Sequence, residues 1–374
     1  MNSTGISKRI AYIDLARCVA ILLVALNHAV NKSFSIYSGA TAIMLEYVQM
    51  PFALTALKSS LFVLSRIGVP FFLMITGALM LGRDYSEDKS ICFLQRNWLP
   101  LIITTEIWLV IMFWFMQLLP GSVLKTEGLA NCLSRFITTL CFINPVTLGN
   151  MWYMPMILCV YLMIPVFSTA LKAIPHRYFM VPVAIVLVST FLLADVNAAF
   201  TELRLDVLEW QIDSVNLFSF YLVYVLAGFC IQQGYFQRFG SGLLCFISIL
   251  GFTGAVAFQM WFYSRGSEFV LDYNSLLILL LSVPAFELLR RRRECGAHTR
   301  ALTEKTAGMA FGIYFVHRVI TEAVDILMRA YLPNIVHFQK LLIIWVLSFF
   351  GSIAVIMLFG RTRRIRKYMF GMKD

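Results

Sequence analysis

An arginine and a histidine stand inside the first long apolar stretch of the sequence, which runs from Ile10 to Val30. Arg17 and His28 are eleven positions apart. Because each helical residue turns by about 100°, eleven residues return both side chains to one face, separated by about 16 Å along the axis. Ionisable groups at membrane depth are costly and usually mark a water-filled path or the interior of a bundle. We therefore look for chemistry first at this pair.

The same helical face predicts a partner and a role for the pair. Asp14 lies three residues before Arg17 and is placed to pair with it, whereas His28 lies three turns further on. A neutral imidazole can act as a base toward an acceptor hydroxyl, or as a nucleophile that carries an acyl group. The alternative is a histidine that only bonds to a neighbouring helix. The arginine on the same face favours catalysis.

A third cation, Arg66, lies in the second apolar stretch and is expected at roughly the depth of His28. Arg66 could bind an anionic acceptor or a developing oxyanion near His28. The alternative is an interfacial arginine that extends outward to water. In the following residues, Pro70 is expected to kink the helix, and Thr76 and Gly77 to allow close contact with another helix.

Other polar residues within apolar stretches are candidates for substrate binding. Glu106 and His317, which precedes Arg318, are costly enough in a membrane to need partners, and these partners could be purely structural. Trp152 and Tyr153 open an apolar stretch at its outer end. Such residues stack on sugars or, more commonly, form the interfacial aromatic belt.

The elements that position these residues must be membrane helices. Of the 374 residues, 60% are hydrophobic and only 14% charged, and apolar runs of near-spanning length recur along the chain. The fold class is therefore all-α, a polytopic integral membrane protein with one membrane-embedded domain over 1–374 and no separate soluble domain. Ten helices are expected, at 10–30, 61–82, 98–119, 151–171, 178–195, 217–233, 242–263, 273–289, 306–328 and 340–360.

Charge asymmetry orients this bundle. With both termini in the cytoplasm, twenty Lys and Arg residues fall on the cytoplasmic side, eight on the opposite side and three within helices. The long loops 31–60, 120–150 and 196–216 then face outward, with the segments 43–57 and 132–146 as interfacial or re-entrant pieces. The first stretch contains three ionisable residues and lacks a clear cleavage site, so it is expected to be a retained helix.

Basic residues on the cytoplasmic side could meet the phosphates of a donor. The clusters at 290–293 and 361–367 are most simply the positive-inside signal, but Arg83, Arg96 and His298 are also candidates. The eight cysteines show no metal-ligand spacing, so no metal is expected. Cys132 and Cys141 share an outer loop and could be bridged there.

Several of these motifs together resemble a known family, the membrane-bound acyltransferase type 3 family. The likeness spans nearly the whole chain. It is carried by the segments Ile13 to Arg17, Asn27-His28, Arg66 to Gly77, Met151 to Met154, Tyr161 to Pro165 and Gly312 to His317. Among its members, the pattern looks closest to the enterobacterial common antigen type of O-acetyltransferase. One departure is Asn150, which stands where the family often has a histidine.

The resemblance implies transfer of an acyl group, commonly acetyl from acetyl-CoA, to hydroxyls of surface polysaccharides, lipopolysaccharide or their lipid-linked precursors. It assigns catalysis to Arg17 and His28 and supports Arg66 and, less strongly, Arg96. The expected location is the bacterial inner membrane, with acetyl-CoA as cytoplasmic co-substrate, no permanently bound cofactor and no nucleic acid partner. A transporter or flippase for a lipid-linked sugar is the rival hypothesis, because polar residues within helices also suit a permeation path.

Overall fold

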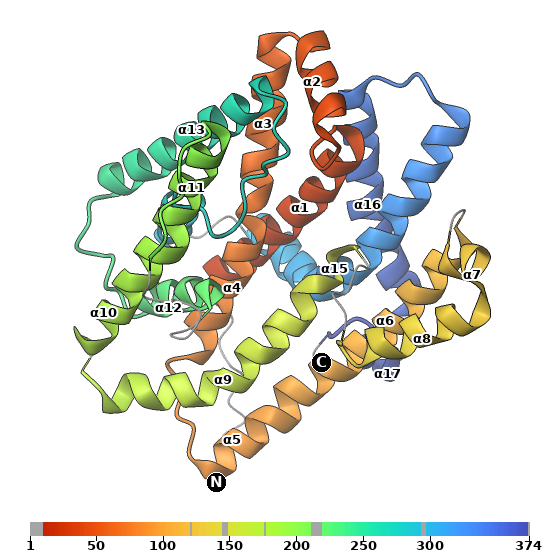
Figure 1. Ribbon diagram of the computed structural model, residues 1–374. Coiled ribbons are helices and arrows are strands. Elements are labelled where there is room, and N and C mark those ends of the chain that lie inside the picture. The colour runs from red at the N-terminus through yellow and green to blue at the C-terminus, as the bar shows by residue number, and fades with distance from the viewer. Residues whose placement is uncertain are drawn as a thin grey trace. The chain divides into compact units, whose positions relative to one another are not determined.

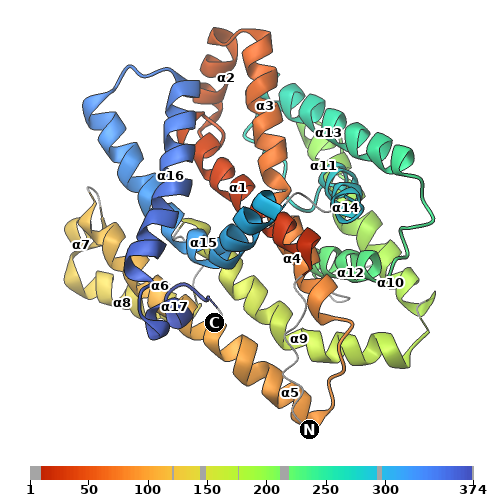
Figure 2. The same ribbon diagram turned by 180° about the vertical axis from the view of Figure 1, so that it is seen from behind.

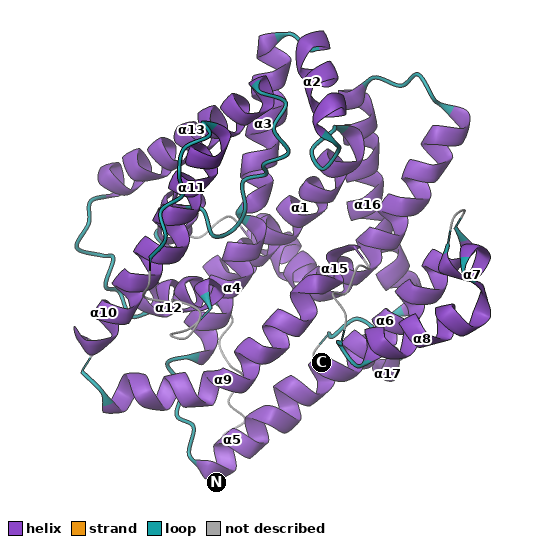
Figure 3. Ribbon diagram, viewed as in Figure 1, coloured by secondary structure: helices purple, strands orange, loops and turns teal. Residues whose placement is uncertain are grey.

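The computed structural model describes residues 10–119, 122–143, 149–175, 177–210, 219–292 and 297–372. Within these ranges every regular element is a helix and no residue lies in a strand, as Figure 3 shows. The predicted all-α class is confirmed.

Seven helical stretches in the described part of the chain are long and apolar enough to cross a membrane. They are α1 (Ala11–Ser33), α3 with α4 (Phe52–Met80), α5 to α6 (Glu87–Leu118), α9 with its preceding turn (Asn150–Ala173), α10 to α11 (Arg177–Glu202), α13 (Ser241–Ser264) and α16 (His337–Phe359). The remaining predicted segments are also helical, as α12 (Phe220–Gln232), α14 (Leu276–Arg290) and α15 (Ala297–Tyr331). The chain is thus a multi-pass membrane protein, while ten crossings and cytoplasmic termini stay predictions.

The helices gather into two compact units. Unit 1 comprises Met1–Gly82 and Pro175–Ala310, and unit 2 comprises Arg83–Ile174 and Phe311–Asp374. The long helix α15 therefore contributes its first turns to unit 1 and the rest to unit 2. The expectation of a single domain stays a prediction.

Close helix crossings hold unit 1 together. Helix α1 packs against α3 and α4, α4 against α12, and α13 against α14 (Figures 1 and 2). Two glycines make the α4–α12 crossing possible. A Cβ on Gly77 would lie 1.8 Å from the carbonyl oxygen of Val225, and one on Gly228 would lie 2.0 Å from that of Met74. The expected close contact at Gly77 is confirmed.

The second membrane stretch is longer than predicted and is interrupted. It begins at Phe52, after Pro51, rather than at 61, and divides into α3 (Phe52–Arg66) and α4 (Gly68–Met80) at Ile67. Pro70 explains the break, because it has no N–H to donate to the carbonyl of Arg66 four residues earlier. Residues 43–57, expected as interfacial or re-entrant pieces, form α2 (Ala40–Gln49) and the first turns of α3.

Unit 2 is built on α6 (Leu99–Leu118), α9 (Tyr153–Ala173), the later turns of α15 and α16. The smaller elements of this unit are α5 (Glu87–Phe93), η1 (Leu94–Trp98), α7 (Val123–Thr126), α8 (Gly128–Leu140), η2 (Gly149–Trp152) and α17 (Arg363–Tyr368). Trp108 stacks on Phe315 and donates its indole N–H to the carbonyl of Met369, which holds the C-terminal segment against α6.

Two cysteines of the predicted outer loop are free thiols. Cys132 is buried on α8 and Cys141, directly after that helix, is exposed. The possible bridge between them is not formed. The remainder of the predicted interfacial piece, residues 144–148, lies outside the described part of the chain.

Candidate active site

The two charged residues at the start of α1 form the predicted ion pair. Nη1 of Arg17 lies 3.2 Å from Oδ1 of Asp14. Asp14 is buried, whereas the Arg17 side chain is 34% exposed. The Asp14 carboxylate therefore holds one nitrogen of the guanidinium, and part of the Arg17 side chain stays accessible to a ligand.

The face of α1 that carries Arg17 and His28 packs against other helices. Ile21 and Val24 are buried between the two ends of the stripe, and His28 is half-buried. Gly68 packs directly on this face, since a Cβ there would lie 2.9 Å from the Ala20 carbonyl oxygen and 3.0 Å from the Val24 side chain. The face that carries Arg17 and His28 is thus turned toward protein.

A side-chain hydrogen bond fixes the level at which α1 and α3 cross. Asn27 donates from Nδ2 to Oγ of Ser65 over 2.9 Å, and both side chains are buried. Asn27 directly precedes His28, and Ser65 directly precedes Arg66. The contact therefore brings these two candidate residues to the same level of the α1–α3 crossing in unit 1.

Arg66 is buried and contacts the loops at this end of unit 1. Its Nε donates to the carbonyl of Leu271 and its Nη2 to the hydroxyl of Tyr37, both over 2.9 Å. Nη2 also lies 3.7 Å from Oδ1 of Asp272, and the guanidinium lies over the Tyr273 ring. An arginine that merely extends outward to water would be exposed, so that alternative is wrong.

A second buried cation was missed by the sequence reasoning. Lys58 on α3 and Glu46 on α2 are both buried and form an ion pair of 2.6 Å. Burial by itself raises the pKa of Glu46, but the Lys58 charge and hydrogen bonds from Lys58 and Ser35 outweigh it and lower the pKa. Two opposite charges within otherwise apolar segments were the available signal.

The candidates in unit 2 form a separate polar cluster around Tyr314. Asn150 donates to the Tyr314 carbonyl over 2.8 Å, and the Tyr314 hydroxyl donates back to the carbonyl of Asn150. The Tyr153 ring lies 5.7 Å from the Tyr314 ring, whose centre lies 6.1 Å from that of His317. His317 is fully buried, with Nδ1 2.8 Å from the Ile313 carbonyl. Tyr153 and His317 thus belong to one cluster.

Three further candidates of unit 2 lie outside this cluster's core. Arg96 is exposed on the π-helical turn η1, an irregularity frequent at functional sites. Glu106 is half-buried on α6, and Trp152 is half-buried beside Tyr153. Arg318, which follows His317 on α15, forms an ion pair with Glu322 at 2.5 Å.

Comparison with known families decides the reaction class. The acyltransferase 3 family model, described as an acyltransferase domain, matches residues 10–361. The chain belongs to the acyltransferase 3 family. The match includes the candidate residues from Asp14 to Arg318. No curated protein and no solved structure gave a match.

Half of the first basic cluster in this acyltransferase is structural. Glu287, which is buried, binds Arg290 through two hydrogen bonds and Arg291 through a third of 2.6 Å. Arg291 also bonds to Ser241. Among the other donor-site candidates, Arg83 is exposed. Arg293 and the side chain of His298 lie outside the described part.

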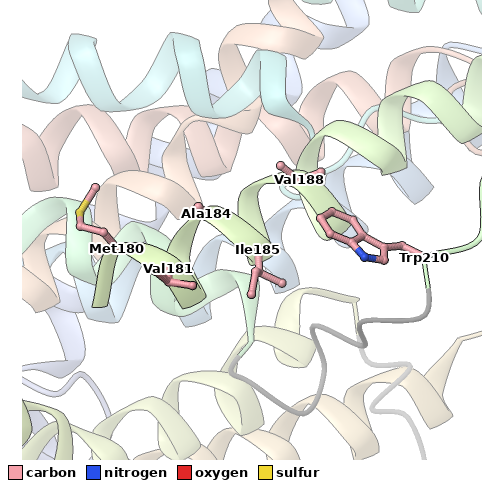
Figure 4. A pocket seen from close by; sticks show the side chains of 6 residues that line it. All are labelled: Met180, Val181, Ala184, Ile185, Val188 and Trp210. Carbon is pink, nitrogen blue, oxygen red and sulfur yellow. The ribbon is translucent and has the colours of Figure 1, made fainter. Parts of the chain in front are cut away.

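The described residues of the acyltransferase hold no group of His, Cys, Asp or Glu that could bind a metal ion. Figure 4 shows an apolar recess of unit 1 that contains no candidate site residue. It is lined by Met180, Val181, Ala184, Ile185, Val188 and Trp210. Because its walls carry no polar chemistry, the recess does not compete with the α1 face as the reaction site.

Proposed function

We propose that this acyltransferase transfers acetyl from acetyl-CoA to a hydroxyl of a cell-surface polysaccharide or its lipid-linked precursor. The family membership supplies the acyl-transfer chemistry. The resemblance to O-acetyltransferases of the enterobacterial common antigen type favours a sugar acceptor. The proposed location is the bacterial inner membrane, with the donor on the cytoplasmic side and the glycan outside.

The observation that carries this proposal is the Asn27–Ser65 hydrogen bond. His28 and Arg66 each directly follow a residue of this bond, which supports a shared role for the imidazole and the buried guanidinium. In the proposed reaction His28 takes the hydroxyl proton of the acceptor as that oxygen attacks the thioester carbonyl carbon. The carbon–sulfur bond then breaks, and coenzyme A leaves as the thiol with the proton from His28. The fixed charge of Arg66 favours the developing negative oxygen.

Arg17 serves the donor in this scheme. It stands about 16 Å from His28 along α1, so the two residues cannot act on the same atom. The partly exposed guanidinium, oriented by Asp14, is suited to a polar or anionic part of the donor. We assign Arg96 to the donor phosphates, and Glu106, Trp152, Tyr153 and His317 to substrate binding.

The test uses the full-length protein in lipid nanodiscs with labelled acetyl-CoA and deacetylated oligosaccharides from the surface of the producing bacterium. His28→Ala should lower acetyl transfer by about 100-fold or more, and Arg17→Ala should also impair it. His337→Ala, at an exposed histidine on α16, should retain it. Full transfer by the His28 variant would refute the catalytic assignment. Absence of transfer by the wild type, with surface glycans unchanged by mass spectrometry on deletion, would refute the function.

A further inference from the structure

Two exposed side chains from different loops meet at one buried cation in unit 1. Tyr37 lies between α1 and α2, and Asp272 lies between α13 and α14. Nη2 of Arg66 donates to the Tyr37 hydroxyl and lies 3.7 Å from Oδ1 of Asp272. Tyr37 is nevertheless 61% exposed and the Asp272 side chain 56% exposed. The buried guanidinium of Arg66 thus holds one polar atom of each residue, while the rest of each side chain stays largely exposed.

The Tyr37 ring is held in place without being covered. Its hydroxyl is the anchored atom, while most of the residue is exposed. An aromatic ring that is already oriented loses little conformational entropy when a ligand stacks on it. Its open face suits the apolar C–H face of a pyranose ring, while its polar edge stays hydrogen-bonded.

Asp272 adds a hydrogen-bond acceptor beside this ring. Its Oδ1 accepts the backbone N–H of Tyr273 over 2.7 Å and faces Arg66, which fixes the carboxylate plane. The side chain is 56% exposed, so part of the carboxylate group stays accessible to a ligand. A carboxylate is acceptor-only and recognises donors, such as the hydroxyl groups of a sugar.

The loop that carries Asp272 is braced on both sides of it. The buried Gln259 donates to the Phe269 carbonyl over 3.2 Å and accepts the Leu271 N–H over 2.9 Å. The Tyr224 hydroxyl donates to the carbonyl of Tyr273 over 2.7 Å. A binding group on so constrained a backbone is preorganised.

A further bond ties the two loops together. The N–H of Ala40, at the start of α2, donates to Oε1 of Glu268 over 3.0 Å. Tyr37 and Asp272 are therefore connected through Arg66, and the segments that carry them are also joined by the bond from the Ala40 N–H to the Glu268 side chain. The pair lies at the end of α1 that carries His28, since Tyr37 follows the last residue of α1, Ser33, by four positions.

We propose that Tyr37 and Asp272 form the acceptor-sugar subsite, in which the ring stacks on a pyranose and the carboxylate accepts hydrogen bonds from its hydroxyls. This subsite rests on the proposed function, because it supplies that reaction with its acceptor. Arg66 acts on it as a positioning residue.

Direct binding tests the subsite apart from catalysis. Full-length protein in nanodiscs is titrated with the deacetylated surface oligosaccharides, without acetyl-CoA, and Kd is measured by calorimetry. Tyr37→Ala and Asp272→Asn should each raise Kd about tenfold, and Tyr37→Phe, which keeps the ring, should raise it less. Tyr178→Ala and Asp206→Asn are matched controls at exposed residues away from Arg66, and both should retain the wild-type Kd.

Turnover provides the second readout. Both subsite variants should raise KM for the oligosaccharide, because each loses a contact to the acceptor. Wild-type Kd and KM in both variants would overturn the subsite even if acetyl transfer is confirmed. Conversely, the wild type could fail to use acetyl-CoA while both variants bind the oligosaccharide more weakly. That outcome would refute the proposed function and uphold the subsite.

Discussion

Lys58 and Glu46 form a buried ion pair, with Nζ of the lysine 2.6 Å from Oε1 of the glutamate. The pair joins α3 to α2, and the second carboxylate oxygen accepts the N–H of Ser35 over 2.7 Å. The ammonium lies 4.2 Å from the centre of the Tyr263 ring. These contacts hold the hairpin of α2 and α3 next to the loop of Tyr37, so the pair supports the proposed acceptor end of unit 1.

Removal of both partners of this pair should destabilise unit 1 by less than the sum of the two single removals. Lys58→Met or Glu46→Gln alone leaves its partner buried without its counter-charge, and each should cost about 3 kcal/mol of unfolding free energy. The double variant should cost less than the sum of the single variants. Denaturant unfolding in detergent measures all three. Lys89→Met, which removes an exposed partner of Asp84, is the control and should have little effect. Additive losses would contradict the coupling.

The same pair should make stability depend on pH. Because the pKa of Glu46 is lowered in the folded protein, the ionised carboxylate contributes stability fully above the ordinary pKa of about 4.3. That contribution is lost as pH falls through the lower folded-state value. The Tm difference between wild type and Glu46→Gln should therefore shrink on acidification. A constant difference across the acidic range would argue against an ionised Glu46.

The α4–α12 crossing should tolerate no side chain at its glycines. In Gly77→Ala the new methyl group would overlap the Val225 carbonyl, so the helices must separate, at a cost of about 2 kcal/mol. Gly242→Ala on α13 is the matched control, since nothing lies within 4 Å of its Cβ position. The unfolding midpoints of the two variants provide the comparison. Equal midpoints would refute the role of the close crossing.

Loss of the Asn27–Ser65 bond should lower activity without removing a reacting group. Ser65→Ala deletes the acceptor of the Asn27 amide, so α1 and α3 are less firmly positioned, and kcat should fall about tenfold. Ser264→Ala on α13 removes a hydroxyl with the same type of bond to the carbonyl three residues earlier, and it should retain activity. Full kcat in the Ser65 variant would show that this bond does not position His28.

The sequence alone determined the features that depend on local periodicity. Apolar runs of spanning length predicted ten helical segments, and each of them overlaps a helix in the described part of the chain. The spacing of Asp14 and Arg17 predicted their ion pair, because residues three apart on a helix are neighbours wherever that helix packs. The motifs along the chain also indicated the family that the comparison established.

Helix limits and long-range partners were decided by the tertiary structure. Helix α3 begins nine residues before the predicted start, because Lys58 can be buried once Glu46 on α2 balances its charge. Tyr37 and Asp272 gave no local signal, since they lie in loops distant from Arg66 in the sequence. The periodicity of apolar residues shows which face of a helix is buried. The way in which helices cross determines which residues of another segment contact that face.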